Sequence, residues 1–177
     1  MNEEEFDKHF NSKPERDIIE NKEYLMIKID NKGRSSRDFP MTYKCFEGVD
    51  SVMSADDLKS GTPVFVERVS GEENLYYIRM TSSTYKDKNY FTMSNGSGMR
   101  LIFLGEKSSA QPFHIGYSRI GKLEIRPSIG GVLDRDISLE EQDGKGYLIS
   151  YPYRMPSSLR TTVDIPRLHS IVLVEIE

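Results

Sequence analysis

Apolar residues alternate with polar ones from Glu23 to the end of this chain. A spacing of two places apolar side chains on one face of a half-buried strand. The first such run contains Leu25, Ile27 and Ile29. Similar runs recur at 41–45, 64–66, 76–80, 91–93, 99–103, 113–115, 123–125, 131–134, 146–151, 162–165 and 170–174. No long helical period interrupts them, so the pattern predicts an all-β domain of about a dozen short strands.

The segment before the strands has a different pattern. Phe6, His9 and Phe10 are spaced as one face of a helix, and Pro14 ends that spacing. We therefore expect residues 1–22 to form an N-terminal arm, either a short docking helix or a frayed end. Residues 23–177 are expected to form the folded domain.

The strands recur in three blocks that open in a similar way. The blocks begin at Glu23–Ile27, Leu75–Arg79 and Lys122–Arg126. Each spans roughly 45 to 50 residues and about four strands, which is the signature of an internal repeat. If the blocks pack around a pseudo-threefold axis, Ile27, Ile78 and Ile125 should occupy equivalent buried positions. Within the first block, 54–58 is expected to form one helical turn in a loop.

The middle block gives the clearest family resemblance. It opens at Tyr77-Ile78, continues at 89–92 after a loop, and closes at 110–115 with Gln111 two residues before Phe113. That close resembles the Gln-x-Trp ending of ricin B-type lectins, with Phe113 in place of the tryptophan, and 132–134 is similar to their Cys-Leu-Asp stretch. The chain thus resembles a β-trefoil, although it contains no tryptophan.

The resemblance implies a binding function rather than catalysis. Ricin B-type lectins hold sugar with an aspartate, an aromatic platform and an amide, which implies a carbohydrate site at Asp134, Tyr151 and Tyr153. The same fold carries mycocypin-type protease inhibitors, which the chain resembles in outline. The candidate protein-binding segment is the long polar loop at 30–40, because loops of this length on a rigid scaffold are commonly functional. Its candidate residues are Lys32, Gly33, Arg34 and Arg37. The expected partner is a glycan or a protein such as a protease.

Charge and length narrow the classes of partner. The net charge is −4, with 24 basic and 28 acidic residues interspersed along the chain. A nucleic-acid footprint needs clustered Lys and Arg, so no nucleic-acid partner is expected. The densest basic stretch, 85–90, is interpreted as a solvated hairpin loop. No apolar run approaches the roughly 20 residues that span a bilayer, and the acidic start lacks signal-peptide features. We therefore expect a cytoplasmic protein without a membrane partner.

The candidate catalytic and metal-ligating residues do not form a recognisable set. The three histidines have no His or Cys at metal-ligand spacing, and no nucleophile and base are paired by sequence pattern. We expect no enzymatic activity, no metal and no cofactor. The single cysteine, Cys45, is interpreted as a buried small hydrophobe in a strand, with a reactive thiol as the alternative.

Overall fold

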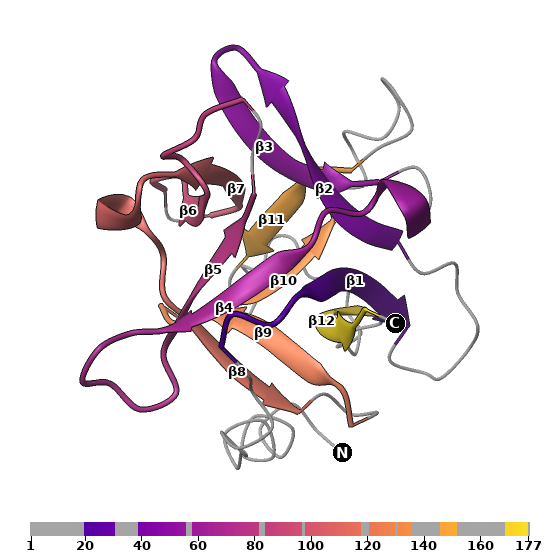
Figure 1. Ribbon diagram of the computed structural model, residues 1–177, viewed down its shortest axis with the longest axis vertical. Helices are drawn as coiled ribbons and strands as arrows, with labels where there is room; N and C mark the ends of the chain where they lie inside the picture. Colours follow the sequence, from indigo (N-terminus) through magenta and orange to yellow (C-terminus); the bar gives the residue numbers. More distant parts are fainter. Residues whose placement is uncertain are drawn as a thin grey trace.

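The computed structural model describes residues 20–30, 39–55, 58–81, 84–96, 98–117, 121–129, 131–135, 146–151 and 169–176. These residues form twelve strands in one sheet with antiparallel pairing, which confirms the predicted all-β class (Figure 1). The strands are β1 (Tyr24–Asp30), β2 (Phe39–Phe46), β3 (Val49–Ser54), β4 (Val64–Arg68), β5 (Tyr76–Met80), β6 (Tyr90–Met93), β7 (Arg100–Gly105), β8 (Phe113–Tyr117), β9 (Leu123–Pro127), β10 (Val132–Arg135), β11 (Leu148–Tyr151) and β12 (His169–Glu175). Two short 3-10 turns, η2 (Leu58–Ser60) and η3 (Lys107–Ser109), lie between strands.

Six of the strands pair in a closed ring. The order around the ring is β1, β4, β5, β8, β9 and β12, and β12 pairs with β1 again. The closing pair is long, because β1 and β12 run side by side from Tyr24 opposite Glu175 to Asp30 opposite His169. Strands from the two ends of the described chain therefore complete the same structure.

The other six strands form three hairpins: β2 with β3, β6 with β7, and β10 with β11. Their second strands also contact one another, since β3 pairs with β7, β7 pairs with β11, and an isolated bridge joins Met53 beside β11 at Tyr147. The β2–β3 hairpin projects furthest (Figure 1). Glu47 and Gly48 at its tip both have positive φ, of 49° and 82°, as a tight two-residue turn requires.

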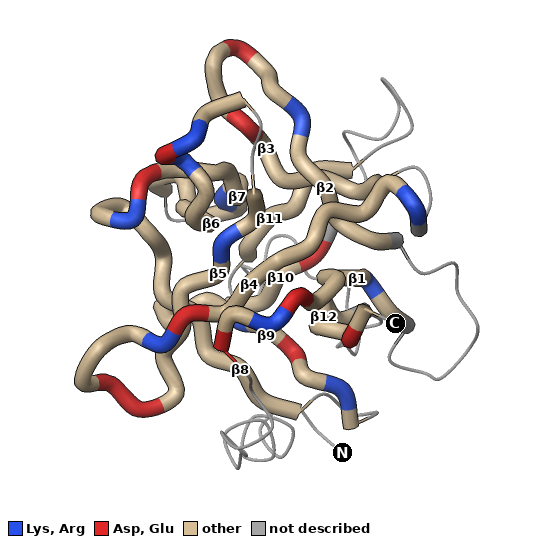
Figure 2. The backbone as a smooth tube through the Cα atoms, in the orientation of Figure 1, with Lys and Arg blue, Asp and Glu red and all other residues tan. Residues whose placement is uncertain are grey.

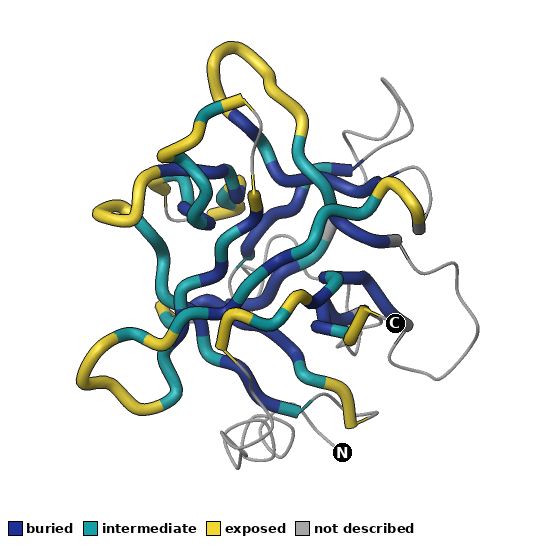
Figure 3. Tube along the Cα trace, viewed as in Figure 1, coloured by how far each residue is buried: buried dark blue, intermediate teal, exposed yellow. Residues whose placement is uncertain are grey.

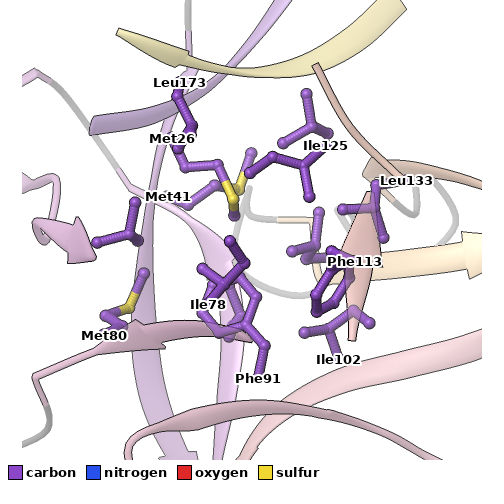
Figure 4. Packing of buried hydrophobic residues seen from close by; sticks show 14 of the residues in the cluster. Met26, Met41, Ile78, Met80, Phe91, Ile102, Phe113, Ile125, Leu133 and Leu173 are labelled. Atoms are coloured by element: carbon purple, nitrogen blue, oxygen red, sulfur yellow. The ribbon is translucent and has the colours of Figure 1, made fainter. Parts of the chain in front are cut away.

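The same register recurs in all three units. Met26 lies opposite Leu173, Ile78 opposite Val66, and Ile125 opposite Ile115. All six side chains belong to one buried cluster inside the ring, and Figure 4 shows Met26, Ile78 and Ile125 converging there.

The prediction for Ile27 was wrong. Ile78 and Ile125 lie in the common core, but Ile27 packs in a separate small cluster with Ile29 and Val172. Its neighbour Met26 takes the equivalent position. The reason is that β1 is buried on both faces, so apolar residues occur at consecutive positions and the alternation does not identify the inward face (Figure 3).

The core combines side chains from the ring and the hairpins. Phe113, which closes the middle block, is fully buried and packs edge-on against Phe91, with ring centroids 6.2 Å apart. Beside it, the Gln111 N–H donates to the carbonyl of Phe91 at 2.9 Å. The largest fully buried side chains are Tyr24, Tyr76, Phe91, Phe113, Met26, Met41, Met53, Ile78, Met80, Ile102 and Ile115. Each stabilises the fold by about 1.5 to 3 kcal/mol through removal of apolar surface from water.

Two local expectations were also wrong. The helical turn expected at 54–58 is not what Ser54 forms, because this residue ends β3, a strand the pattern did not predict, and the 3-10 turn begins at Leu58. Cys45 was interpreted as buried but is exposed, because it lies near the hairpin tip, beyond the core.

Other expected features fall on residues that are not described. Residues 1–19 of the expected arm lie outside the described residues, as does the strand expected at 162–165. From the end of that arm, the Glu20 carboxylate accepts a hydrogen bond of 2.6 Å from the Arg68 N–H.

Candidate functional site

A groove of about 650 Å³ lies between the β2–β3 hairpin and the second unit. Its lining residues are 48–50 at the start of β3, 85 and 88 in the β5–β6 connection, 92–95 at the end of β6, and 103–106 and 109 around the end of β7. Ligand sites in proteins typically enclose about 300 to 1,000 Å³ and combine apolar walls with a few polar groups. The groove is therefore the candidate functional site.

Asp50 forms the base of the wall that the first hairpin supplies. It is fully buried and lies opposite both Cys45 on β2 and Leu104 on β7. Directly opposed residues of an antiparallel pair direct their side chains to the same face. Cys45 and Asp50 thus share the face of the hairpin that the β5–β6 connection approaches.

Tyr85 in that connection lies against this pair. Repulsion from a Cys45 thiolate and hydrogen bonding with Cys45 raise the pKa of the Tyr85 phenol, and partial burial and the Asp50 carboxylate raise it further. The phenol therefore keeps its proton at neutral pH and remains able to donate a hydrogen bond. The Lys88 ammonium lies 5.0 Å from the centroid of the Tyr85 ring, in a cation–π contact.

The opposite wall comes from the β6–β7 hairpin and mixes apolar and polar groups. Met93 and Phe103 provide apolar surface, while Ser94, Asn95 and Glu106 provide a hydroxyl, an amide and a carboxylate. The Ser94 hydroxyl accepts a hydrogen bond of 2.9 Å from the Leu101 N–H, which ties the end of β6 to β7. This arrangement suits a ligand with hydroxyl groups and an apolar face.

Gly105 allows the two strands of this wall to approach closely. A Cβ atom at this position would lie 2.6 Å from the Thr92 hydroxyl oxygen, well inside van der Waals contact. Both residues line the groove. A larger residue at position 105 would therefore change the shape of the wall.

A polar cluster holds the segments beside the groove. The Glu67 carboxylate on β4 accepts hydrogen bonds from the Tyr90 hydroxyl at 2.6 Å and from the Lys107 ammonium at 2.7 Å. Burial raises the pKa of Glu67, but these two hydrogen bonds outweigh it and lower the pKa overall. Burial and the hydrogen bond to Glu67 raise the pKa of Tyr90, and that same carboxylate raises the pKa of Lys107. The start of β6 and the turn η3 are thereby fixed to β4.

Charges of both signs surround the groove. Figure 2 shows Lys and Arg interspersed with Asp and Glu over the described chain rather than gathered on one face. In the lining itself, Lys88 is accompanied by Asp50 and Glu106. This mixture does not favour a strongly charged ligand.

The predicted carbohydrate residues lie elsewhere, on the third hairpin. Asp134 on β10 lies opposite Ile149, and Tyr151 on β11 lies opposite Val132, so Asp134 and Tyr151 are diagonal neighbours on one face. Tyr153 lies outside the described residues. The hairpin therefore brings two of the three predicted residues together.

Asp134 also has a structural partner. Its Oδ1 atom lies 3.1 Å from the Nζ atom of Lys28, whose side chain is only 6% exposed, while the Asp134 side chain is 22% exposed. A buried ammonium needs a compensating charge. The carboxylate of Asp134 is thus committed to neutralising Lys28.

The predicted protein-binding residues Lys32, Gly33, Arg34 and Arg37 lie outside the described residues. Sequence reasoning missed three groove residues, Asp50, Tyr85 and Lys88. The available signal was the aromatic-flanked basic stretch at 85–90, which was interpreted as a solvated loop. Nothing in the pattern indicated that this loop lies against a hairpin some 40 residues earlier in the chain, since Tyr85 and Cys45 are 40 residues apart.

Comparison with known protein families, curated proteins and solved structures finds no match to this chain. The described residues include no helix that is long and apolar enough to cross a membrane. They also include no group of three His, Cys, Asp or Glu side chains placed to hold a metal ion.

Proposed function

We propose that the chain is a β-trefoil. The support is the threefold recurrence of one pairing scheme: a closed ring of six strands, three hairpins, and mutual contact of the hairpins' second strands. Equivalent core positions at Met26, Ile78 and Ile125 are separated by 52 and 47 residues, from 78 − 26 and 125 − 78. These spacings agree with the repeat length expected from the pattern.

We further propose that this trefoil is a non-enzymatic carbohydrate-binding protein whose site is the groove between the first hairpin and the second unit. The observation that carries the proposal is the composition of a 650 Å³ groove that includes Tyr85, Asn95 and Asp50 in its lining. The aromatic ring offers an apolar face for a sugar ring, and the amide and hydroxyl groups can pair with sugar hydroxyls. Buried Asp50 supports Tyr85 from behind.

A glycan array probed with the full chain tests this function, followed by an amide NMR titration with the best-binding glycan. We expect chemical-shift changes concentrated at 85–95 and 103–109. Replacing Lys88 or Asn95 by alanine should weaken binding by about tenfold, the equivalent of one lost contact of about 1.4 kcal/mol. Lys86→Ala is the matched control, because Lys86 is exposed and does not line the groove.

The outcomes distinguish the groove from the third hairpin. Absence of binding across a broad glycan set would overturn the function. Binding with shifts centred on Asp134 and Tyr151 instead would place the sugar at the site predicted from the sequence, and the groove would not be the site.

A second candidate function, protease inhibition or other protein binding, is favoured by the tip of the β2–β3 hairpin. Phe46 and Val49 at this tip are 44% and 39% exposed, although both are apolar. Exposed apolar side chains on a projecting hairpin suit insertion into a partner's cleft. Inhibition assays with papain-like and trypsin-like proteases test it, with Phe46→Ser as the variant expected to lose any inhibition.

A further inference from the structure

We infer that ligand binding in the groove is regulated by covalent modification of Cys45 with a small-molecule disulfide, with Tyr85 transmitting the change. The inference extends the proposed function, because it concerns regulation of the same site. It rests on three features that meet at the groove: an exposed thiol, a tyrosine in contact with it, and a lysine stacked on that tyrosine.

The thiol is accessible and has no internal cysteine partner. Cys45 is the only cysteine of the chain and is exposed near the end of the β2–β3 hairpin. An intramolecular disulfide is therefore impossible, and oxidation leads to a mixed disulfide with an external thiol compound. Modification at this position does not require the core to open, because the residue lies beyond it.

The reaction is a thiol–disulfide exchange. The Cys45 thiolate attacks one sulfur of a low-molecular-weight disulfide, the S–S bond of that disulfide breaks, and a new S–S bond forms to Cys45. The departing thiolate takes up the proton that Cys45 released. The small disulfide is the oxidant, and a dithiol reverses the reaction.

The adduct would act on the groove through Tyr85. Cys45 and the fully buried Asp50 are opposed on one face of the hairpin, and Tyr85 lies against both. A group the size of a tripeptide on the sulfur cannot occupy the space that the phenol fills, so Tyr85 must move. Lys88 stacks on the Tyr85 ring, and both line the groove, so displacement of the ring alters two lining residues at once.

The experiment uses the full ¹⁵N-labelled chain treated with glutathione disulfide. Intact mass and peptide mapping should show one glutathionyl group at Cys45. The amide signals of 85–88 and 93–95 should shift on modification and return when dithiothreitol is added. Binding of the glycan identified on the array should weaken by about tenfold or more in the modified protein.

Two variants make the result specific. Cys45→Ser should bind the glycan normally and show neither adduct nor shift after treatment. Tyr85→Ala should still form the adduct but should lose the shifts at 93–95, because the transmitting side chain is gone, whereas Lys86→Ala should keep them.

The inference is overturned if Cys45 does not react, if the adduct forms while the groove signals stay in place, or if Tyr85→Ala leaves the shifts unchanged. The NMR arms need no glycan. Failure of the unmodified protein to bind any glycan would therefore count against the proposed function alone, while the shifts would still decide the coupling between Cys45 and the groove.

Discussion

Lys28 places a charge where the other two units have apolar side chains. Its strand position, two residues after Met26, corresponds to Met80 and Pro127, which follow Ile78 and Ile125 by the same interval. All three positions are buried. The ammonium is tolerated because Asp134 lies beside it, and breaking such a pair is costlier than its absence.

The two halves of this ion pair should differ in how much their removal costs. Asp134→Asn leaves the almost fully buried ammonium of Lys28 without its counter-charge and should lower the free energy of unfolding by about 3 kcal/mol or more. Lys28→Met leaves the more exposed Asp134 carboxylate, which water can solvate, and should cost less. Urea denaturation of both variants and of Lys28→Met/Asp134→Leu measures this. Equal costs for the two single variants would contradict the burial argument.

Truncation of the equivalent core residues should destabilise the protein to a similar degree. Met26→Ala, Ile78→Ala and Ile125→Ala each leave a cavity in the common core and should cost about 2 to 5 kcal/mol. Ile129→Ala is the control, because Ile129 is 55% exposed; it should stay within about 0.5 kcal/mol of the parent. Denaturant midpoints give the values, and a cost near zero at Met26 would remove it from the shared core.

At the level of the strands, most of the fold could be predicted from alternation alone, because ring and hairpin strands with one buried face keep a period of two. Strand β3 escaped because its inward positions include Asp50 and Ser54, which are buried but polar. The face of β1 escaped because both of its faces are buried. The groove could not be predicted, since it depends on how the β5–β6 connection lies against a distant hairpin, and no local period reports that placement.

The contacts of Glu67 join β4 to β6 and η3, and they should make stability depend on pH. The pKa of Glu67 is lower in the folded protein than in the unfolded chain, so its stabilising contribution is complete above the unfolded value of about 4.3 and is lost as pH falls through the folded value. Because Glu67 and Lys107 are 31% and 56% exposed, the contribution is about 0.5 to 1 kcal/mol.

Glu67→Gln tests this pH dependence. The difference in unfolding free energy between the parent and Glu67→Gln should be largest near neutral pH and should shrink between about pH 5 and pH 3. Urea unfolding at several pH values measures it. A difference that stays constant over this range would mean that the glutamate charge does not contribute, and Glu73→Gln, on an exposed turn residue, gives the baseline.

For the whole molecule, closure of the ring depends on a strand pair between the two ends of the described chain. β12 pairs with β1 over its full length and with β9 on its other side, and it buries Ile171, Val172 and Leu173. A chain ending at residue 168 lacks all of these contacts and leaves two ring strands with open edges. Such edges are prone to pairing with other chains.

We therefore expect the chain truncated after residue 168 to lose cooperative unfolding and dispersed amide NMR signals, and to aggregate. Removal of residues 1–19 takes away none of the twelve strands or their pairings, so this matched truncation should unfold cooperatively with a denaturant midpoint close to the parent's. Amide NMR spectra and urea denaturation of the two truncations make the comparison. A cooperatively folded chain without β12 would show that the ring need not close, and that the pairing between β1 and β12 is a consequence of the fold rather than a condition for it.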